Sequence, residues 1–147
     1  MNDKPTTIII SSDHAGYEMK QQLKNYIEKK GLDVIDTGTY SPEAVDYPEF
    51  GHKLGEMIGS GQYAMGISIC GTGNGINMTT NKHKGVRGAI CWNKEIAEMA
   101  RKHNDANICS LAARYLDIQE AKEIVDIFIS TGFDGGRHAR RIKKIDL

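Results

Sequence analysis

Short apolar runs alternate with longer helical stretches along this sequence, and this alternation constrains the fold more than any other feature. Five runs are short, apolar and often β-branched, as buried strands are, and they fall at residues 6–11, 33–36, 65–69, 87–91 and 107–111. Helices are expected at residues 17–30, 50–58, 76–81, 95–103 and 118–130, followed by a basic helix or tail at 138–145. This α/β order predicts βαβ units and a five-stranded parallel sheet with helices on both faces.

The helical stretches carry their apolar residues at helical spacing. The first helix is expected to bury one face, made of Met19, Leu23, Tyr26 and Ile27. In the stretch 95–103, Met99 is expected to point inward, and Met78 is also interpreted as a packing residue. The chain of 147 residues has no repeat, low-complexity segment or linker, so residues 1–147 are predicted to form a single domain.

Composition excludes several classes of protein. Lys plus Arg and Asp plus Glu each number 19, so the formal charge is zero and no overall basic field predicts nucleic-acid binding. Three cysteines without a Cys-x-x-Cys pair argue against a disulfide framework and a structural zinc site. The apolar runs are too short for a membrane span or signal peptide. We therefore expect a cytoplasmic protein that binds neither membranes nor nucleic acid.

A glycine-rich turn, residues 71–75, follows the third expected strand directly. Its three glycines let backbone N–H groups approach a ligand, and such groups at a turn before a helix form a pocket for negative charge. Cys70 lies at the mouth of this pocket, where the positive potential would favour thiolate over thiol. The spacing matches neither the phosphate loop nor the dinucleotide fingerprint, so the turn alone leaves open whether it only closes the chain.

Polar residues follow the other expected strands as well. Asp13 and His14 come after the first strand, and Arg114 comes after the fifth. In a parallel sheet these strand ends meet at one edge, where ligands of open α/β sheets bind. His103 and Asn104 instead end a helix at the opposite edge, so they would join this site only from a neighbouring subunit.

Arg137 and Arg141 stand four residues apart, so on a helix both guanidinium groups share one face and can clamp a phosphate.

Each candidate site residue also has a plainer, structural interpretation. Asp13 can cap a helix, His103 and Asn104 are ordinary at a helix end, and the arginines can belong to a solvated tail. Cys91 and Cys109 lie inside strands and are interpreted as buried thiols that pack as small apolar residues.

Five motifs occur in a characteristic order: Asp13-His14-Ala15-Gly16, Asp46-Tyr47-Pro48, Cys70-Gly71-Thr72-Gly73-Asn74-Gly75, Arg101-Lys102-His103-Asn104-Asp105 and Gly135-Gly136-Arg137-His138-x-x-Arg141. Together they resemble the B-type ribose-5-phosphate isomerases, in the family that also holds the galactose-6-phosphate and allose-6-phosphate isomerases. The resemblance implies a Rossmann-like three-layer α/β/α sandwich that needs no metal or coenzyme. It also implies a homodimer whose active sites are shared between subunits, with a tetramer left open.

The resemblance also implies roles for particular residues. Cys70 matches the base that moves a proton between C1 and C2 of the sugar, and His103 of the partner subunit matches the group that opens the ring. Thr72 assists at the ring oxygen and Tyr47 lines the pocket. The positions that match binding of the sugar and its phosphate are Asp13, His14, Gly71, Gly73, Asn74, Gly75, Asn104, Arg114, Arg137 and Arg141.

The expected activity is interconversion of D-ribose 5-phosphate and D-ribulose 5-phosphate through a cis-enediolate, a step of the non-oxidative pentose phosphate pathway. A six-carbon sugar phosphate, allose 6-phosphate or galactose 6-phosphate, remains an alternative substrate. A non-catalytic phosphate- or nucleotide-binding module is an alternative of another class, but it leaves Cys70 and His103 without a role. A thiol redox protein is disfavoured because no resolving cysteine accompanies Cys70.

Overall fold

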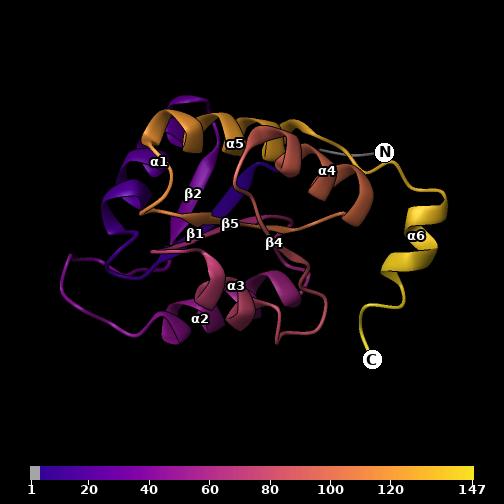
Figure 1. The fold of residues 1–147 in the computed structure, drawn as a ribbon, viewed down its shortest axis with the longest axis horizontal. Helices are drawn as coiled ribbons and strands as arrows, with labels where there is room; N and C mark the ends of the chain where they lie inside the picture. The colour runs from indigo at the N-terminus through magenta and orange to yellow at the C-terminus, as the bar shows by residue number, and fades with distance from the viewer. Residues whose placement is uncertain (1–3) are drawn as a thin grey trace.

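The computed structural model describes residues 4–147, and these form a central sheet covered by helices on both faces (Figure 1). All strand pairs are parallel, and the spatial order of the strands is β2-β1-β3-β5-β4. The strands are β1 (Thr7–Ser12), β2 (Asp33–Asp36), β3 (Gly66–Cys70), β4 (Gly88–Ile90) and β5 (Ile108–Ala112). The predicted five-stranded parallel α/β sheet is therefore confirmed.

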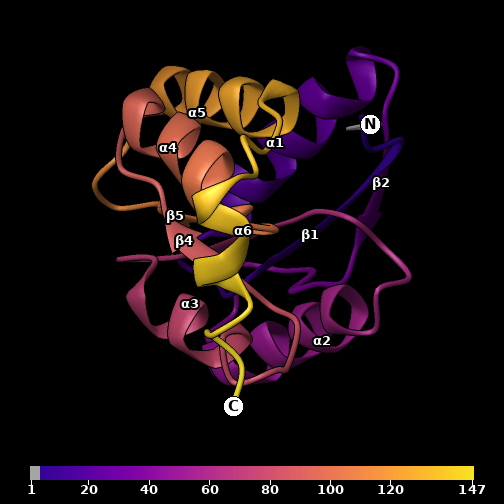
Figure 2. The same ribbon diagram turned by 90° about the vertical axis from the view of Figure 1, so that its right-hand side faces the viewer.

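The helices divide between the two faces of the sheet (Figures 1 and 2). One face carries α1 (Tyr17–Lys29), α4 (Lys94–Asn104) and α5 (Ile118–Ser130), and the other carries α2 (Tyr47–Gly59) and α3 (Asn74–Thr80). The last helix, α6 (Arg137–Ile142), stands outside these layers beyond the end of α4, and each of its residues is at least partly exposed. The three-layer α/β/α arrangement is thus complete without α6.

Side chains of the interior strand β1 point alternately into the two halves of the core. Ile8 and Ile10 pack in the larger apolar cluster under α1, α4 and α5, whereas Ile9 packs on the other face against Leu54 and Ile58 of α2. Successive side chains of a strand point to opposite faces, so a β-branched run suits a strand with helices on both sides. Each fully buried isoleucine contributes about 1.5–3 kcal/mol relative to exposure.

The prediction that Met99 and Met78 pack in the core is wrong. Met99 of α4 is 36 % exposed and Met78 of α3 is 65 % exposed. The buried contacts of α4 are made by the small residues Ala97 and Ala100. Met78 likewise lies away from the buried face of α3, which is formed by Ile76, Thr79 and Thr80. Tyr26, also expected on a buried face, is only partly buried, and its hydroxyl donates to Asp126 at 2.6 Å.

The structure of residues 4–147 gives findings on membrane-spanning helices, on metal-binding side chains and on the cysteines. No helix between residues 4 and 147 is long and apolar enough to cross a membrane. In the same range, no three His, Cys, Asp or Glu side chains lie close enough together to hold a metal ion. The three cysteines are free thiols, and Cys91 and Cys109 are fully buried, as their interpretation as packing residues required.

Candidate active site

The glycine-rich turn connects β3 to α3 at the carboxyl edge of the sheet. Gly73 adopts a left-handed conformation with φ of 77°, and a Cβ there would lie 3.2 Å from the carbonyl carbon of Leu111. Both features favour glycine, because a side chain would strain the backbone and collide with β5. The Asn74 N–H donates to the Thr72 hydroxyl at 3.2 Å, which fixes the turn locally.

Cys70 ends β3 directly beside this turn and is 5 % exposed. The backbone that follows β5 holds the turn, since the Ala113 N–H donates to Cys70 O at 2.9 Å and the Arg114 N–H donates to Gly71 O at 3.0 Å. A Cβ on Gly71 would lie 2.9 Å from Nη1 of Arg114. The guanidinium group therefore lies against the turn at Gly71, the residue that follows Cys70.

Asp13 and His14 follow β1 at the same edge. The Asp13 N–H donates to Ile69 O at 3.2 Å, which ties it to the strand that ends at Cys70. Asp13 Oδ1 accepts from the Gly16 N–H at 3.1 Å, so this carboxylate also shapes the start of α1. His14 Nδ1 accepts from the Val45 N–H at 3.1 Å. A neutral His14 ring must then carry its proton on Nε2, which makes that nitrogen a hydrogen-bond donor.

Tyr47 begins α2 and closes another side of the site. A Cβ on Gly75 would lie 2.6 Å from carbon atoms of the Tyr47 ring, so the ring packs directly on the backbone of α3. Next to it, a cavity of about 450 Å³ is lined by His14, Ala44, Val45, Asp46 and Glu49. A small polar ligand can enter here between the end of β1 and the start of α2.

The structure thus brings most of the sequence-predicted site residues together at the carboxyl edge of the sheet. We call this group the strand-end cluster: Asp13, His14, Tyr47, Cys70, Gly71, Thr72, Gly73, Asn74, Gly75 and Arg114. It combines a buried thiol, backbone N–H groups, a histidine donor and an arginine. This set can hold an oxyanion beside a base, while the role of each residue stays a prediction.

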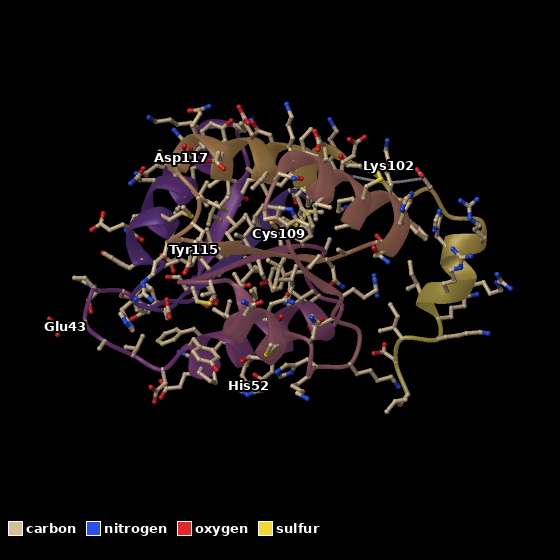
Figure 3. The ribbon with its side chains drawn as sticks, viewed as in Figure 1. Glu43, His52, Lys102, Cys109, Tyr115 and Asp117 are labelled. Carbon is tan, nitrogen blue, oxygen red and sulfur yellow. The ribbon has the colours of Figure 1, made fainter. Side chains whose placement is uncertain are left out.

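The remaining predicted residues lie elsewhere, and we call His103, Asn104, Arg137 and Arg141 with His138 the α4–α6 cluster. The His103 and His138 rings stack with centroids 4.4 Å apart at an interplanar angle of 12°. The Asp134 N–H donates to Lys102 O at 3.0 Å and so ties the segment before α6 to α4. Figure 3 shows Lys102 far across the molecule from Tyr115, the neighbour of Arg114.

The α4–α6 cluster is positively charged. The pKa of His138 lies below its usual value, first because of desolvation and then because of the nearby charges of His103, Arg137 and Arg141. These cations disfavour a further positive charge, so a bound anion would relieve their repulsion. The cluster therefore suits a phosphate group, and within one subunit it is separate from Cys70.

Another cavity, of about 680 Å³, lies at the amino edge of the sheet, away from the strand-end cluster. Two of its arginines have structural partners: Arg101 Nε donates to Thr131 O at 3.0 Å, and Arg87 Nε donates to Asp105 O at 2.9 Å. Helices α4 and α5 end here, so these guanidinium groups satisfy carbonyl groups at helix ends. Size alone therefore does not make this cavity the better candidate.

Sequence reasoning missed Lys20, which is fully buried at the carboxyl edge and paired with Asp36. One signal was available, because Lys20 stands three residues before Leu23 and seven before Ile27 and so lies on the apolar stripe of α1. A hydrogen-bond chain behind the turn, from Ser68 through Ser110 to Asn77, was also missed.

Comparison with known proteins agrees with this geometry. The model of the ribose/galactose isomerase family matches residues 8–145. Ribose-5-phosphate isomerase B of Escherichia coli is 36 % identical over 138 residues, covering 94 % of this chain and 93 % of that protein. The ribose 5-phosphate isomerase structure from Thermotoga maritima is 48 % identical, with a TM-score of 0.94 and coverage of 96 % of this chain and 97 % of that one.

A further solved structure was determined with a ligand. Ribose-5-phosphate isomerase B of Mycoplasma genitalium, with ribulose-5-phosphate bound, is 38 % identical with a TM-score of 0.92. The similarity covers 95 % of this chain and 93 % of that one. Since the family model, the relatives and the structures each span nearly the whole chain, this protein belongs to the ribose/galactose isomerase family.

Proposed function

We propose that this protein interconverts D-ribose 5-phosphate and D-ribulose 5-phosphate by moving a proton between C1 and C2 through a cis-enediolate. The observation that carries the proposal is the position of Cys70, a buried thiol at the start of the turn 71–75, against which the Arg114 guanidinium lies at Gly71. The family membership and the relatives named ribose-5-phosphate isomerase B support the same substrate.

The strand-end cluster supplies the groups that this chemistry needs. The Cys70 thiolate removes the carbon-bound proton, and N–H groups of the turn 71–75 hold the negative oxygen that develops. A donor aimed at such an oxyanion is worth about 3–4 kcal/mol in comparable sites. His14, which donates through Nε2, binds a sugar hydroxyl, and Thr72 assists at the ring oxygen.

The phosphate binds in the α4–α6 cluster, and two copies of the chain form each active site. Because this cluster lies away from Cys70 within one subunit, His103, Arg137 and Arg141 come from the partner. Met78 and Trp92, 65 % and 59 % exposed near the edge strand β4, support an apolar interface there. Phosphate binding away from the reacting carbons supplies energy that orients the sugar. A reducing compartment such as the cytoplasm keeps the Cys70 thiol active.

The activity is tested by following ketose formation from ribose 5-phosphate in the presence of EDTA. We expect turnover that survives the chelator, and a loss of at least about 100-fold in kcat for Cys70→Ala. Cys91→Ala, which removes another buried thiol, is the matched control and should keep its activity. Allose 6-phosphate and galactose 6-phosphate are assayed in parallel. A higher kcat/KM on either sugar than on ribose 5-phosphate would make that sugar the proposed substrate instead. Normal turnover by Cys70→Ala would refute the assignment of Cys70 as the base.

The shared site is tested by mixing two inactive variants, Cys70→Ala and His103→Ala, under conditions that allow subunits to exchange. In mixed dimers one of the two sites keeps both wild-type residues, so roughly a quarter of all sites should regain activity. No recovery, despite exchange demonstrated with differently tagged subunits, would place both residues in the site of one chain.

A further inference from the structure

Lys20 of α1 is fully buried, which is rare for a lysine. Its Nζ donates to both carboxylate oxygens of Asp36 at the end of β2, at 2.7 and 2.6 Å, and to Gln21 Oε1 at 3.2 Å. The Asp36 side chain is 9 % exposed. Burial of both charges costs desolvation energy that their attraction only partly offsets, so the pair is poorly explained as a device for stability alone.

The surroundings of Lys20 leave it little freedom. Its Nζ lies 5.5 Å from the centroid of the Tyr17 ring and 5.7 Å from that of the Tyr40 ring. Lys24 approaches the same carboxylate at 3.8 Å from the more exposed side. Desolvation lowers the pKa of Lys20, and the bond to Asp36 opposes this shift. The ammonium group is therefore enclosed between two rings and held by one carboxylate.

Asp36 also forms hydrogen bonds with the loop of residues 37–46 and so connects Lys20 to this loop. Asp36 Oδ1 also accepts from the Gly38 N–H at 2.9 Å, and its backbone carbonyl accepts from the Tyr40 hydroxyl at 3.0 Å. Ser12 then binds the start of the loop, because its N–H donates to Gly38 O and its carbonyl accepts from the Thr39 N–H, both at 2.8 Å. Ser12 directly precedes Asp13 and His14.

The far end of the same loop contacts the strand-end cluster. The Val45 N–H donates to His14 Nδ1, and Tyr47, two residues later, packs against Gly75. The loop is thus anchored at its start by Lys20 and Asp36 and contacts the candidate site at its end. A change in the position of the loop would move the Val45 amide away from the His14 ring.

We propose that the Lys20–Asp36 pair positions the sugar-binding side of the site: it fixes the loop 37–46, whose Val45 amide holds His14 as an Nε2 donor and whose end sets Tyr47 against Gly75. Lys20 is a positioning residue and does not itself touch the substrate. Its effect on catalysis rests on the proposed isomerase function, whereas its effect on His14 does not.

The kinetic test compares Lys20→Met with Lys30→Met. Lys30 directly follows the last residue of α1 and also pairs with a carboxylate, Asp126, but that pair joins the end of α1 to α5 away from the site. We expect Lys20→Met to raise KM for ribose 5-phosphate about tenfold with kcat changed less than about threefold, because sugar binding is disturbed and the base is not. Lys30→Met should leave both constants unchanged.

A double-mutant cycle tests whether Lys20 acts through His14. If it does, Lys20→Met should raise KM by less than about twofold in a His14→Ala background, because the group that it positions is already missing. Equal effects of Lys20→Met with and without His14 would overturn the proposal. If Lys20→Met does not fold, the same measurements are made on Asp36→Asn, which keeps the size of the side chain.

The tautomer of His14 gives a readout that does not depend on turnover. Ring ¹⁵N spectra of the wild type should show His14 protonated at Nε2, with the signal assigned by its loss in His14→Ala. In Lys20→Met we expect a mixture of tautomers, and in Lys30→Met the wild-type spectrum. An unchanged tautomer in folded Lys20→Met would overturn the positioning role. A wild type inactive on ribose 5-phosphate would instead refute the proposed function and leave this result valid.

Discussion

Two buried thiols of this protein, Cys70 and Cys109, differ in their positions in the fold. Cys70 ends its strand beside the turn 71–75, whereas Cys109 lies inside β5 in the apolar core. Burial raises the pKa of Cys109 well above its ordinary value, and the neighbouring Cys91 adds to the shift. Cys109 is therefore a neutral thiol near neutral pH, with no role as a base. The surroundings of a cysteine, and not its presence, decide what it does here.

The raised pKa of Cys109 predicts a pH-dependent contribution to stability. The unfolded chain loses this proton near the ordinary value of 9.0, whereas the folded chain keeps it to higher pH. The stabilisation is therefore complete below that value and declines as the pH rises above it. We expect the difference in unfolding free energy between wild type and Cys109→Ala to narrow between about pH 8 and about pH 10 in urea titrations. A constant difference would contradict this.

The contact between Gly75 and Tyr47 predicts a separate effect on activity and stability. Gly75→Ala places a Cβ where the Tyr47 ring lies, so the ring must move. Alanine favours a helix over glycine by up to about 1 kcal/mol, so stability should change little while KM for the sugar phosphate rises. Steady-state kinetics and urea unfolding measure both quantities. In a Tyr47→Leu background the same substitution should add little, and a full additional effect would show that the ring is not involved.

Among the elements, the short helix α3 depends on a buried polar connection to the sheet. Ser68 of β3 and Ser110 of β5 bring their hydroxyl oxygens to 2.6 Å, and the Ser110 hydroxyl donates to Asn77 Oδ1 at 2.9 Å. A seven-residue helix has little stability of its own, so such a connection fixes where it lies. The position of α3 in turn sets the geometry of the turn 71–75.

Asn77→Ala should therefore destabilise the fold by about 1–3 kcal/mol, because it leaves the Ser110 hydroxyl buried without its acceptor. Urea unfolding measures this cost. Asn25→Ala, at an exposed position of α1, is the matched control and should change stability by less than about 0.5 kcal/mol. Adding Ser110→Ala to Asn77→Ala should recover part of the loss, and a purely additive result would refute the connection.

In the whole molecule, α6 stands outside the three layers (Figure 1), and its His138 ring stacks on the ring of His103 in α4. No residue of α6 is buried, so we expect its residues to matter more for the proposed site than for the core. In the proposed mechanism, this arrangement separates phosphate binding from proton transfer within one chain. Pairing of two chains would therefore place the parts of the site together.

Removal of residues 136–147 should separate the contribution of α6 to activity from its contribution to stability. We expect the thermal midpoint to fall by less than about 4 °C, because each residue of α6 is at least partly exposed, while isomerase activity is lost with Arg137 and Arg141. Circular dichroism and the ribose 5-phosphate assay measure the two effects. Adding the Cys70→Ala variant should restore some activity by supplying α6 from a second chain, and failure to do so would count against the shared site.

The sequence by itself determined the parallel sheet and the strand-end cluster. Strand and helix periodicity is local, and parallel connections bring residues such as Asp13, Cys70 and Arg114 to one edge in any order of the strands. The sequence also indicated that His103 lies away from that edge, because α4 runs back across the sheet. Its family motifs predicted the residues that bind the sugar phosphate, and the experiments above test their roles.

Only the tertiary structure decided the strand order, the Lys20–Asp36 pair and the tautomer of His14. These depend on contacts between residues far apart in the chain, such as Val45 with His14 across 31 positions. Whether a lysine on an apolar stripe reaches water or a carboxylate depends on what packs above it, which periodicity does not encode. The exposure of Met78 was missed for the same reason, since the face that a short helix buries is decided in the assembled fold.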